Sequence, residues 1–436
     1  MMAKAMNLLA AALLFGGGVA GIVVGCSAEP SAATPEDGGS SDAPAVDQQT
    51  AEAGPEWDPV WHQTTPKQWP TIGKEDQPFC GIGCRMVLNV PIVFGTIYAF
   101  GYDPGAVVAW TGSAATPLAN GIVYSPLDGT DTMVLGPPDL GDKESALFAY
   151  VHDGYVSYVR SLGIGKGSVE VMSVTTGETK TVFEYTPATV GDNAVYQTAL
   201  NKTHAFWWLD GTGLMTRNLE TGAVKELAPQ MVCHGLCTTE NAVICSDFDS
   251  GQNFRIDQET GDVTPVDFGG ALQLDGYCSP DAQRLIWVDY RDPPGPGSTA
   301  YFKRTGGEIY MRDLVGNTTT RLTFDSPDQP RGKTFPAIGS KYAVWNEPPE
   351  PDVNPPTGQD LYASSTNLVR LELATGKKCR LTPDPPGQVK TVPAFAGFKA
   401  MYGSKLVGIW FDNPATQKRL AELDLEDPGL PWKCEP

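Results

Sequence analysis

The chain is short of basic residues and of histidine. Its 436 residues include 31 Lys and Arg against 51 Asp and Glu and only four His, and no segment concentrates basic side chains. Nucleic acids and anionic lipid headgroups select grouped Lys and Arg, so a net charge of -20 argues against both as partners. Charged residues amount to only 19%, and 48 Gly with 37 Pro indicate many turns, which excludes a helical bundle.

Two common enzyme signatures are also missing. The chain contains no Gly-x-Ser-x-Gly nucleophile elbow and no Walker-type phosphate loop. Too few residues remain outside the repeats described below for a separate hydrolase domain. Serine hydrolases with a neighbouring catalytic domain and phosphate-loop nucleotide hydrolases are therefore disfavoured.

The first 25 residues have the character of an export signal. Lys4 precedes an apolar run over residues 8–24, and small residues lead up to Cys26. This ending resembles the lipobox of bacterial lipoproteins, which implies removal of residues 1–25 and lipidation of Cys26. Ser27 after the cysteine is similar to the outer-membrane sorting pattern, so we expect a cell-envelope protein of the outer membrane, periplasmic or surface-exposed. An uncleaved transmembrane anchor is the alternative, and five glycines within residues 16–25 weaken it.

Residues 26–56 are expected to form a disordered tether behind the lipidated cysteine. The stretch is rich in Ala, Pro, Ser, Gly, Asp and Glu and has no Lys, Arg or aromatic residue. Such a composition cannot bury enough apolar surface to offset the entropy lost on ordering.

A hairpin pattern recurs along the remainder of the chain. Each unit has an alternating strand, a turn with glycine and a second short strand, as in residues 169–183. The turn glycines follow one another about 50 residues apart on average: Gly129, Gly177, Gly222, Gly261, Gly316, Gly376 and Gly429. This period predicts an all-β protein, a β-propeller of four-stranded blades.

The number of blades follows from the number of units. Seven units over residues 91–436 predict seven blades, or six if residues 84–140 form no complete blade. Residues 57–90, with three tryptophans, are expected to form an N-terminal extension that packs on the propeller or helps to close it.

One unit also carries a family resemblance. Ser279-Pro280-Asp281 leads into an apolar strand that ends at Asp289, and the segments EIYMRDL from Glu308 and TTRLT from Thr319 follow. These residues resemble the TolB-like propeller repeat, closely over residues 271–324 and more loosely elsewhere. The resemblance implies the fold. TolB itself has a separate mixed domain and is a soluble periplasmic protein, so a role in the Tol assembly does not carry over.

Acidic residues recur at the end of the second strand of each unit. They stand two positions after a large residue, and they are Asp210, Asp247, Asp289, Glu347 and Asp412. Equivalent positions of a propeller lie on a ring, which predicts an acidic circle that could hold a structural calcium ion or attract a basic partner. Alternatively, each carboxylate bonds the backbone of its own turn.

Two consecutive units have long connections, over residues 291–306 and 348–366. Connections after equivalent strands leave on one face, and long loops on a rigid scaffold often bind partners. The aromatic and guanidinium groups suited to an interface are Tyr301, Phe302, Arg304 and Tyr362. We expect this loop-rich face to bind a protein or glycan; the alternative is variable loops without a partner.

Eight cysteines remain in an exported chain, which suggests disulfides. Cys80 and Cys84 can join within a Gly-rich loop, and a hairpin turn brings Cys233 near Cys245. Cys233 and Cys237 lie too far apart along an extended strand. A pair between the matching positions Cys379 and Cys434 stays open.

Together these features predict a lipid-anchored, non-catalytic binding or scaffolding module of the cell envelope. We expect no cofactor, apart from the calcium ion considered above. The alternative is a metal-dependent, lyase-like carbohydrate-active enzyme, because some propeller polysaccharide lyases hold a metal through channel histidines. His152, His204 and His234 are the candidates for that site, although no spacing links them.

Overall fold

The computed structural model divides the chain into a unit over Met1–Asp58 and a unit over Pro59–Pro436. It describes residues 57–73, 80–92, 100–103, 106–110, 122–126, 128, 130–135, 145–163, 165–190, 195–247, 250–266, 273–279, 283–290, 307–325, 332–347, 367–382, 395–413 and 417–435. The expected signal, Cys26 and all of the expected tether lie outside these residues. No helix in the described part of the chain is long and apolar enough to cross a membrane.

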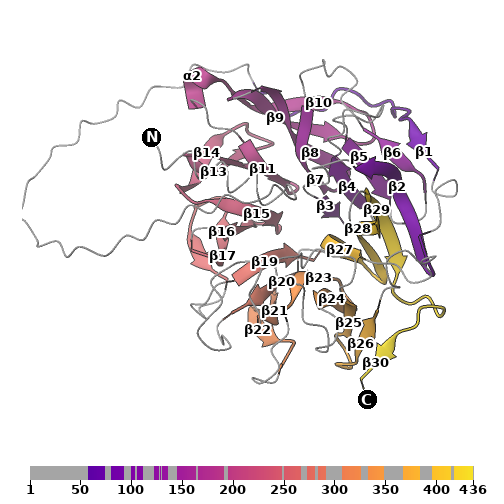
Figure 1. The fold of residues 1–436 in the computed structure, drawn as a ribbon. Coiled ribbons are helices and arrows are strands. Elements are labelled where there is room, and N and C mark those ends of the chain that lie inside the picture. Colours follow the sequence, from indigo (N-terminus) through magenta and orange to yellow (C-terminus); the bar gives the residue numbers. More distant parts are fainter. Residues whose placement is uncertain are drawn as a thin grey trace, which may run out of the picture. The chain divides into compact units, whose positions relative to one another are not determined.

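The second unit is a β-propeller of seven antiparallel sheets (Figure 1). Blades 2 and 3 consist of β7 (Ser145–His152), β8 (Tyr155–Gly163), β9 (Lys166–Ser173), β10 (Thr179–Tyr185), β11 (Val195–Leu200), β12 (His204–Leu209), β13 (Gly213–Asn218) and β14 (Val224–Pro229). Blades 4 and 5 consist of β15 (Cys233–Thr238), β16 (Ala242–Asp247), β17 (Gln252–Asp257), β18 (Val263–Pro265), β19 (Gln273–Cys278), β20 (Arg284–Asp289), β21 (Glu308–Asp313) and β22 (Thr318–Arg321). The short helix α2 (Pro187–Val190) precedes blade 3.

The remaining three blades each take a strand from elsewhere in the chain. Blade 1 contains β3 (Phe100–Asp103), β4 (Ala106–Trp110), β5 (Ile122–Pro126) and β6 (Thr132–Val134), with β1 (Thr71–Ile72) added. Blade 6 contains β23 (Thr334–Ile338), β24 (Tyr342–Glu347), β25 (Asn367–Glu372) and β26 (Lys378–Leu381), with β30 (Lys433–Cys434) added. Blade 7 combines β27 (Phe395–Tyr402), β28 (Lys405–Asn413) and β29 (Gln417–Asp424) with β2 (Cys84–Ile92).

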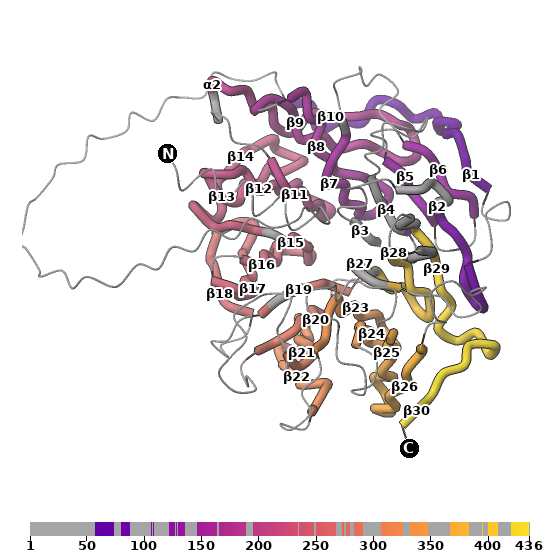
Figure 2. The backbone as a smooth tube through the Cα atoms, in the orientation of Figure 1, coloured from indigo at the N-terminus to yellow at the C-terminus, as the bar shows by residue number. Residues whose placement is uncertain are grey.

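The ring closes through the first strand of each blade and through β2. Successive first strands β3, β7, β11, β15, β19, β23 and β27 contact one another, and β27 contacts β3 again. In blade 7 the outer strand is β2, and Cys84 pairs with Leu423 of β29. The chain thus joins its N-terminal part to its last blade, as the tube in Figure 2 shows. The prediction of a seven-bladed, all-β propeller is confirmed.

Middle strands are buried on both sides because each blade packs between two neighbours. All six residues of β12 are buried, whereas β22 alternates between exposed and partly buried residues. The apolar runs of the second strands, such as Leu285-Ile286-Trp287-Val288, therefore form the inter-blade core. Each buried aliphatic or aromatic side chain there contributes about 1.5–3 kcal/mol relative to an exposed one.

The outer hairpins repeat one turn. The backbone of Gly177 has a φ of +72° and its N–H donates to the carbonyl of Ser173, four residues back, at 2.8 Å. Gly222, Gly261 and Gly376 repeat this geometry, which L side chains rarely adopt. This turn explains four of the seven recurrent glycines; Gly316 and Gly429 do not share its positive φ, and Gly129 lies outside the described residues.

The two faces of the ring carry different connections. Because consecutive strands of a blade are antiparallel, the link between its second and third strands leaves on one face, here called the connection face. The turns that join strands one to two and three to four lie on the opposite face, here called the turn face. Residues 290–307 and 348–366 are links of the first kind, in blades 5 and 6.

Residues 60–70 form a strap along the turn face of blade 2. Trp61 packs on Tyr155, with ring centroids 5.0 Å apart. The Lys67 N–H donates to the Thr175 carbonyl at 2.8 Å, and the Glu178 carboxylate accepts the N–H groups of His62 and Gln63 at 3.1 and 2.7 Å. The strap then continues into β1 of blade 1, and so it fastens two neighbouring blades together.

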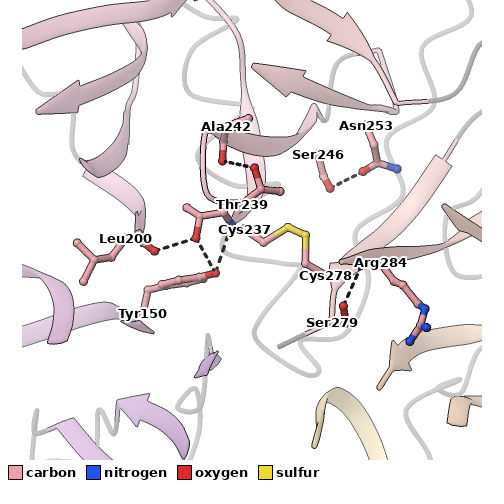
Figure 3. The surroundings of a disulfide bond; sticks show 11 residues. Tyr150, Leu200, Cys237, Thr239, Ala242, Ser246, Asn253, Cys278, Ser279 and Arg284 are labelled. Carbon is pink, nitrogen blue, oxygen red and sulfur yellow. Dashed lines mark hydrogen bonds between the residues drawn. A yellow bond between two sulfur atoms is a disulfide. The ribbon is translucent and has the colours of Figure 1, made fainter. Parts of the chain in front are cut away.

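Four disulfides join the eight cysteines. The two pairs that the sequence indicated, Cys80–Cys84 and Cys233–Cys245, are present, and so is the open candidate Cys379–Cys434. The remaining pair, Cys237–Cys278, joins the first strands of blades 4 and 5 (Figure 3). Beside it, the Tyr150 hydroxyl accepts the Thr238 N–H at 3.3 Å, which links blade 2 to blade 4.

The disulfides are expected to contribute unequally to stability. Cys379 and Cys434 close a loop with a sequence separation of 55, against 4 for Cys80 and Cys84. From the entropy of loop closure in the unfolded chain, the first pair is expected to stabilise the fold by about 4 kcal/mol and the second by about 2 kcal/mol. We predict that replacing both cysteines of Cys379–Cys434 by Ser lowers the unfolding midpoint more than the same change at Cys80–Cys84. Thermal unfolding of both double variants tests this order; equal or reversed shifts contradict it.

Candidate binding face

The four aromatic and guanidinium side chains expected at the loop-rich face lie outside the described residues: Tyr301, Phe302, Arg304 and Tyr362. The structure does describe the residues from which the two long connections start and to which they return. These are Asp289 and Glu308 in blade 5, and Glu347 and Asn367 in blade 6. Each set is a cross-strand pair, so the base of each connection is held by the sheet.

Two of the predicted acids bond a tryptophan in their own strand. The Trp287 indole N–H donates to Asp289 at 2.9 Å, and the Trp345 indole N–H donates to Glu347 at 2.8 Å. Residues i and i+2 of a strand share a face, which places the carboxylate beside the indole. Both rings are fully buried, so the carboxylate satisfies an N–H group that has no access to water.

The other predicted acids differ from this arrangement. Asp247 accepts the N–H groups of Val232 and Ser250 at 3.2 and 2.9 Å, which is the turn-bonding role. Asp210 follows the end of β12, and the side chain of Asp412 is outside the described residues. Within the described segments, no group of three or more His, Cys, Asp or Glu side chains could hold a metal ion.

Register explains the exception of Asp210. The last residue of the second strand pairs with the first residue of the third: Asp289 with Glu308, Glu347 with Asn367, and in blade 3 Leu209 with Gly213. Leu209 therefore occupies the acid position, and the alignment that gave this place to Asp210 is wrong by one residue. In agreement, the buried indole N–H of Trp207 has no hydrogen-bond partner among the described residues.

Glu347 is also the centre of an ion-pair cluster. Its carboxylate lies 3.4 Å from Lys378 Nζ and 3.2 Å from Arg380 Nε, and its side chain is 0% exposed. Burial by itself raises the pKa of Glu347, but Lys378, the Trp345 N–H and Arg380 outweigh it, so the pKa lies below its usual value. The carboxylate is charged at neutral pH and fixes the start of the connection that follows it.

A second ion-pair cluster joins blade 5 to the segment that leads into blade 6. The Lys333 side chain is 0% exposed, and its ammonium group contacts Asp325 at 2.5 Å, Glu308 at 3.3 Å and the Gly307 carbonyl at 3.1 Å. Arg321 donates to the other oxygen of Glu308 at 3.0 Å. Gly307 directly precedes β21, so Lys333 holds the returning end of the long connection of blade 5.

Hydrogen bonds keep Glu308 ionised within this cluster. Burial raises the pKa of Glu308, whereas the Thr323 hydroxyl, Lys333, the Asp325 N–H and Arg321 together lower it below the usual value. Sequence reasoning missed Glu308, Asp325 and Lys333. They come together from β21, from the segment after β22 and from the link to blade 6, and no local spacing marks them.

The three histidines considered for a channel site lie on the strands of three different blades. His204 begins β12 and is buried: its Nδ1 lies 2.9 Å from the Thr203 hydroxyl, and its Nε2 lies 3.6 Å from Glu259. Burial lowers the pKa of its imidazole, against the smaller, opposite effect of Glu259. His152 ends β7, and the side chain of His234 is outside the described residues.

No protein-family model matches the chain, and no curated protein matches its sequence. Among solved structures, oligogalacturonate lyase from Vibrio parahaemolyticus shares 10% identity at a TM-score of 0.50, over 83% of this chain and 98% of that one. An oligogalacturonate lyase in complex with manganese shares 13% identity at a TM-score of 0.48, over the same fractions. TolB from Acinetobacter baumannii shares 11% identity at a TM-score of 0.34, over 75% of this chain and 79% of that one. These likenesses concern the β-propeller fold alone.

A pair of substitutions tests the tryptophan–carboxylate bond. Trp345→Phe removes an indole N–H that bonds Glu347, whereas Trp207→Phe removes an indole N–H that bonds no residue in the described part of the chain. The lost ring volume is the same in both fully buried sites. We expect Trp345→Phe to cost about 1–2 kcal/mol more unfolding free energy than Trp207→Phe. Urea unfolding measures both; equal losses would show that the hydrogen bond contributes nothing.

Proposed function

We propose that the protein is a non-catalytic binding or scaffolding module whose connection face, over blades 5 and 6, receives a protein or a glycan. The observation that carries the proposal is the framework beneath that face. One end of each long connection is held by buried ion pairs: the start in blade 6, at Glu347, and the return in blade 5, around Glu308 and Lys333. Long loops fixed at rigid bases present a binding surface at small entropic cost.

We also propose that the propeller is tethered to the cell envelope. The lipobox-like residues before Cys26, and the acidic, aromatic-free stretch after it, support an outer-membrane lipoprotein with an unstructured tether. A lipid on Cys26 would keep the module at the membrane while its connection face binds.

Fatty-acid labelling tests the tether. The full chain, expressed in a bacterium, is expected to incorporate labelled palmitate and to lack residues 1–25, because Cys26 would be the new N-terminus. Cys26→Ser abolishes the label, and Cys434→Ser, as a control, retains it. Label that persists in Cys26→Ser, or a mature chain that still contains residues 1–25 by mass spectrometry, contradicts lipidation.

Photo-crosslinking in the producing cells tests the binding face. Benzoylphenylalanine inserts into C–H bonds and therefore captures proteins and glycans alike. We expect discrete adducts from the probe at position 301 or 362, and none from the probe at Val263, an exposed residue on the outer strand of blade 4.

Two results would overturn this function. The first is the absence of adducts from both positions 301 and 362. The second is cleavage of oligogalacturonate by the purified chain with manganese added, since that is the enzymatic alternative: a metal-dependent lyase with a site in the channel.

A further inference from the structure

Phe324 is an exposed aromatic residue held by a rigid backbone. Its surface is 74% exposed. On one side the Thr323 hydroxyl donates to Glu308, and on the other the Asp325 N–H donates to Glu308 at 2.8 Å. Just before them, the Leu322 N–H donates to the Ile309 carbonyl at 2.8 Å. The ring is thus presented to solvent by residues that are locked onto the buried ion-pair cluster of blade 5.

The Arg321 guanidinium covers one face of this ring. Its centre lies 4.8 Å from the centroid of the Phe324 ring. The same guanidinium is fixed by Glu308 at 3.0 Å and by the Thr323 carbonyl at 2.7 Å. Paired aromatic and arginine side chains are enriched at the centres of protein interfaces. Since both partners are already ordered, little conformational entropy remains to be lost on binding.

The position of Phe324 places it on the connection face. It lies beyond β22, next to Glu308, where the long connection of blade 5 returns to the sheet. Val315, the other strongly exposed apolar side chain that the structure describes in this blade, at 79%, lies in the hairpin turn between β21 and β22, on the turn face. The described residues of blade 5 therefore expose one fixed aromatic side chain on the connection face and one valine on the opposite face.

The segment that forms blades 5 and 6 differs in net charge from the rest of the chain. Residues 271–382, which span blades 5 and 6 and their connections, contain 13 basic and 13 acidic residues, leaving 18 basic and 38 acidic residues elsewhere. The whole net charge of -20 thus lies outside these two blades. A partner with an acidic surface is repelled by the rest of the chain, which carries the net negative charge. It meets no net charge in the segment that forms blades 5 and 6.

We propose that Phe324, backed by Arg321, is the anchor with which the connection face binds a folded protein that has an apolar pocket. The inference rests on the proposed binding function and names the class of partner. A projecting ring is fully removed from water only by a concave apolar surface, which a folded protein provides and a glycan chain does not. The fixed Arg321 gives the pocket rim a charged group to bond.

Site-specific crosslinking in the full chain tests the anchor. Benzoylphenylalanine at position 324 is expected to give a discrete adduct that protease digestion removes, and the probe at Val315 is expected to give none. With the probe at position 301, Phe324→Ala should lower adduct yield about tenfold or more, whereas Val315→Ala leaves it unchanged. Phe324→Tyr, which keeps the ring, restores most of the yield. Because Phe324 is exposed, thermal unfolding of Phe324→Ala is expected to match that of the unmodified chain.

The outcomes separate this inference from the function beneath it. Adducts from positions 301 or 362 that are unaffected by Phe324→Ala overturn the anchor and leave the binding function standing. An adduct from position 324 that resists protease but yields to glycosidases overturns the choice of a protein partner. The absence of adducts from all three positions, 301, 324 and 362, overturns the inference and the binding function together.

Discussion

Closure of the ring is the constraint on which the structure depends. Each blade is apolar on both faces, so an open array would leave two terminal blades with a core surface in water. The chain meets this constraint with β2, which supplies the outer strand of blade 7. Further links fasten the first and last parts of the propeller. β1 extends blade 1, the strap joins blade 1 to blade 2, and β30 is bonded to blade 6 by Cys379–Cys434.

A closed ring gives the connection face a fixed base on which charge can be buried. Lys333 and Glu347 are charged groups with no exposed side chain, and removing such groups from water is costly unless geometry and partners are well matched. Ion pairs and hydrogen bonds are directional, whereas apolar contacts are not. They therefore set the return of the long connection in blade 5 and the exit of the long connection in blade 6, a task that apolar packing would perform less specifically.

The sequence predicts this fold well because its signals are local. Alternation, turn glycines and the hairpin between Cys233 and Cys245 each depend on neighbouring residues. Register within a doubly buried strand is different: Trp207 and Trp208 are both apolar, alternation vanishes, and Asp210 was placed one residue away from the acid position. The Lys333 cluster was unpredictable for another reason, since Lys333 lies in the link to blade 6, beyond the last strand of blade 5, and no local spacing connects it to Glu308.

The junction between β2 and β29 also determines when the ring can close during folding. β1 and β2 are the first strands of the propeller to be synthesised, while β29 is among the last. Until β29 forms, β2 has no strand partner in its own blade, and its unpaired edge is able to pair with other chains. Joining residues so distant in sequence makes closure a slow, late step of folding. The newly synthesised chain must therefore be protected from self-association for the whole time that its blades are being completed.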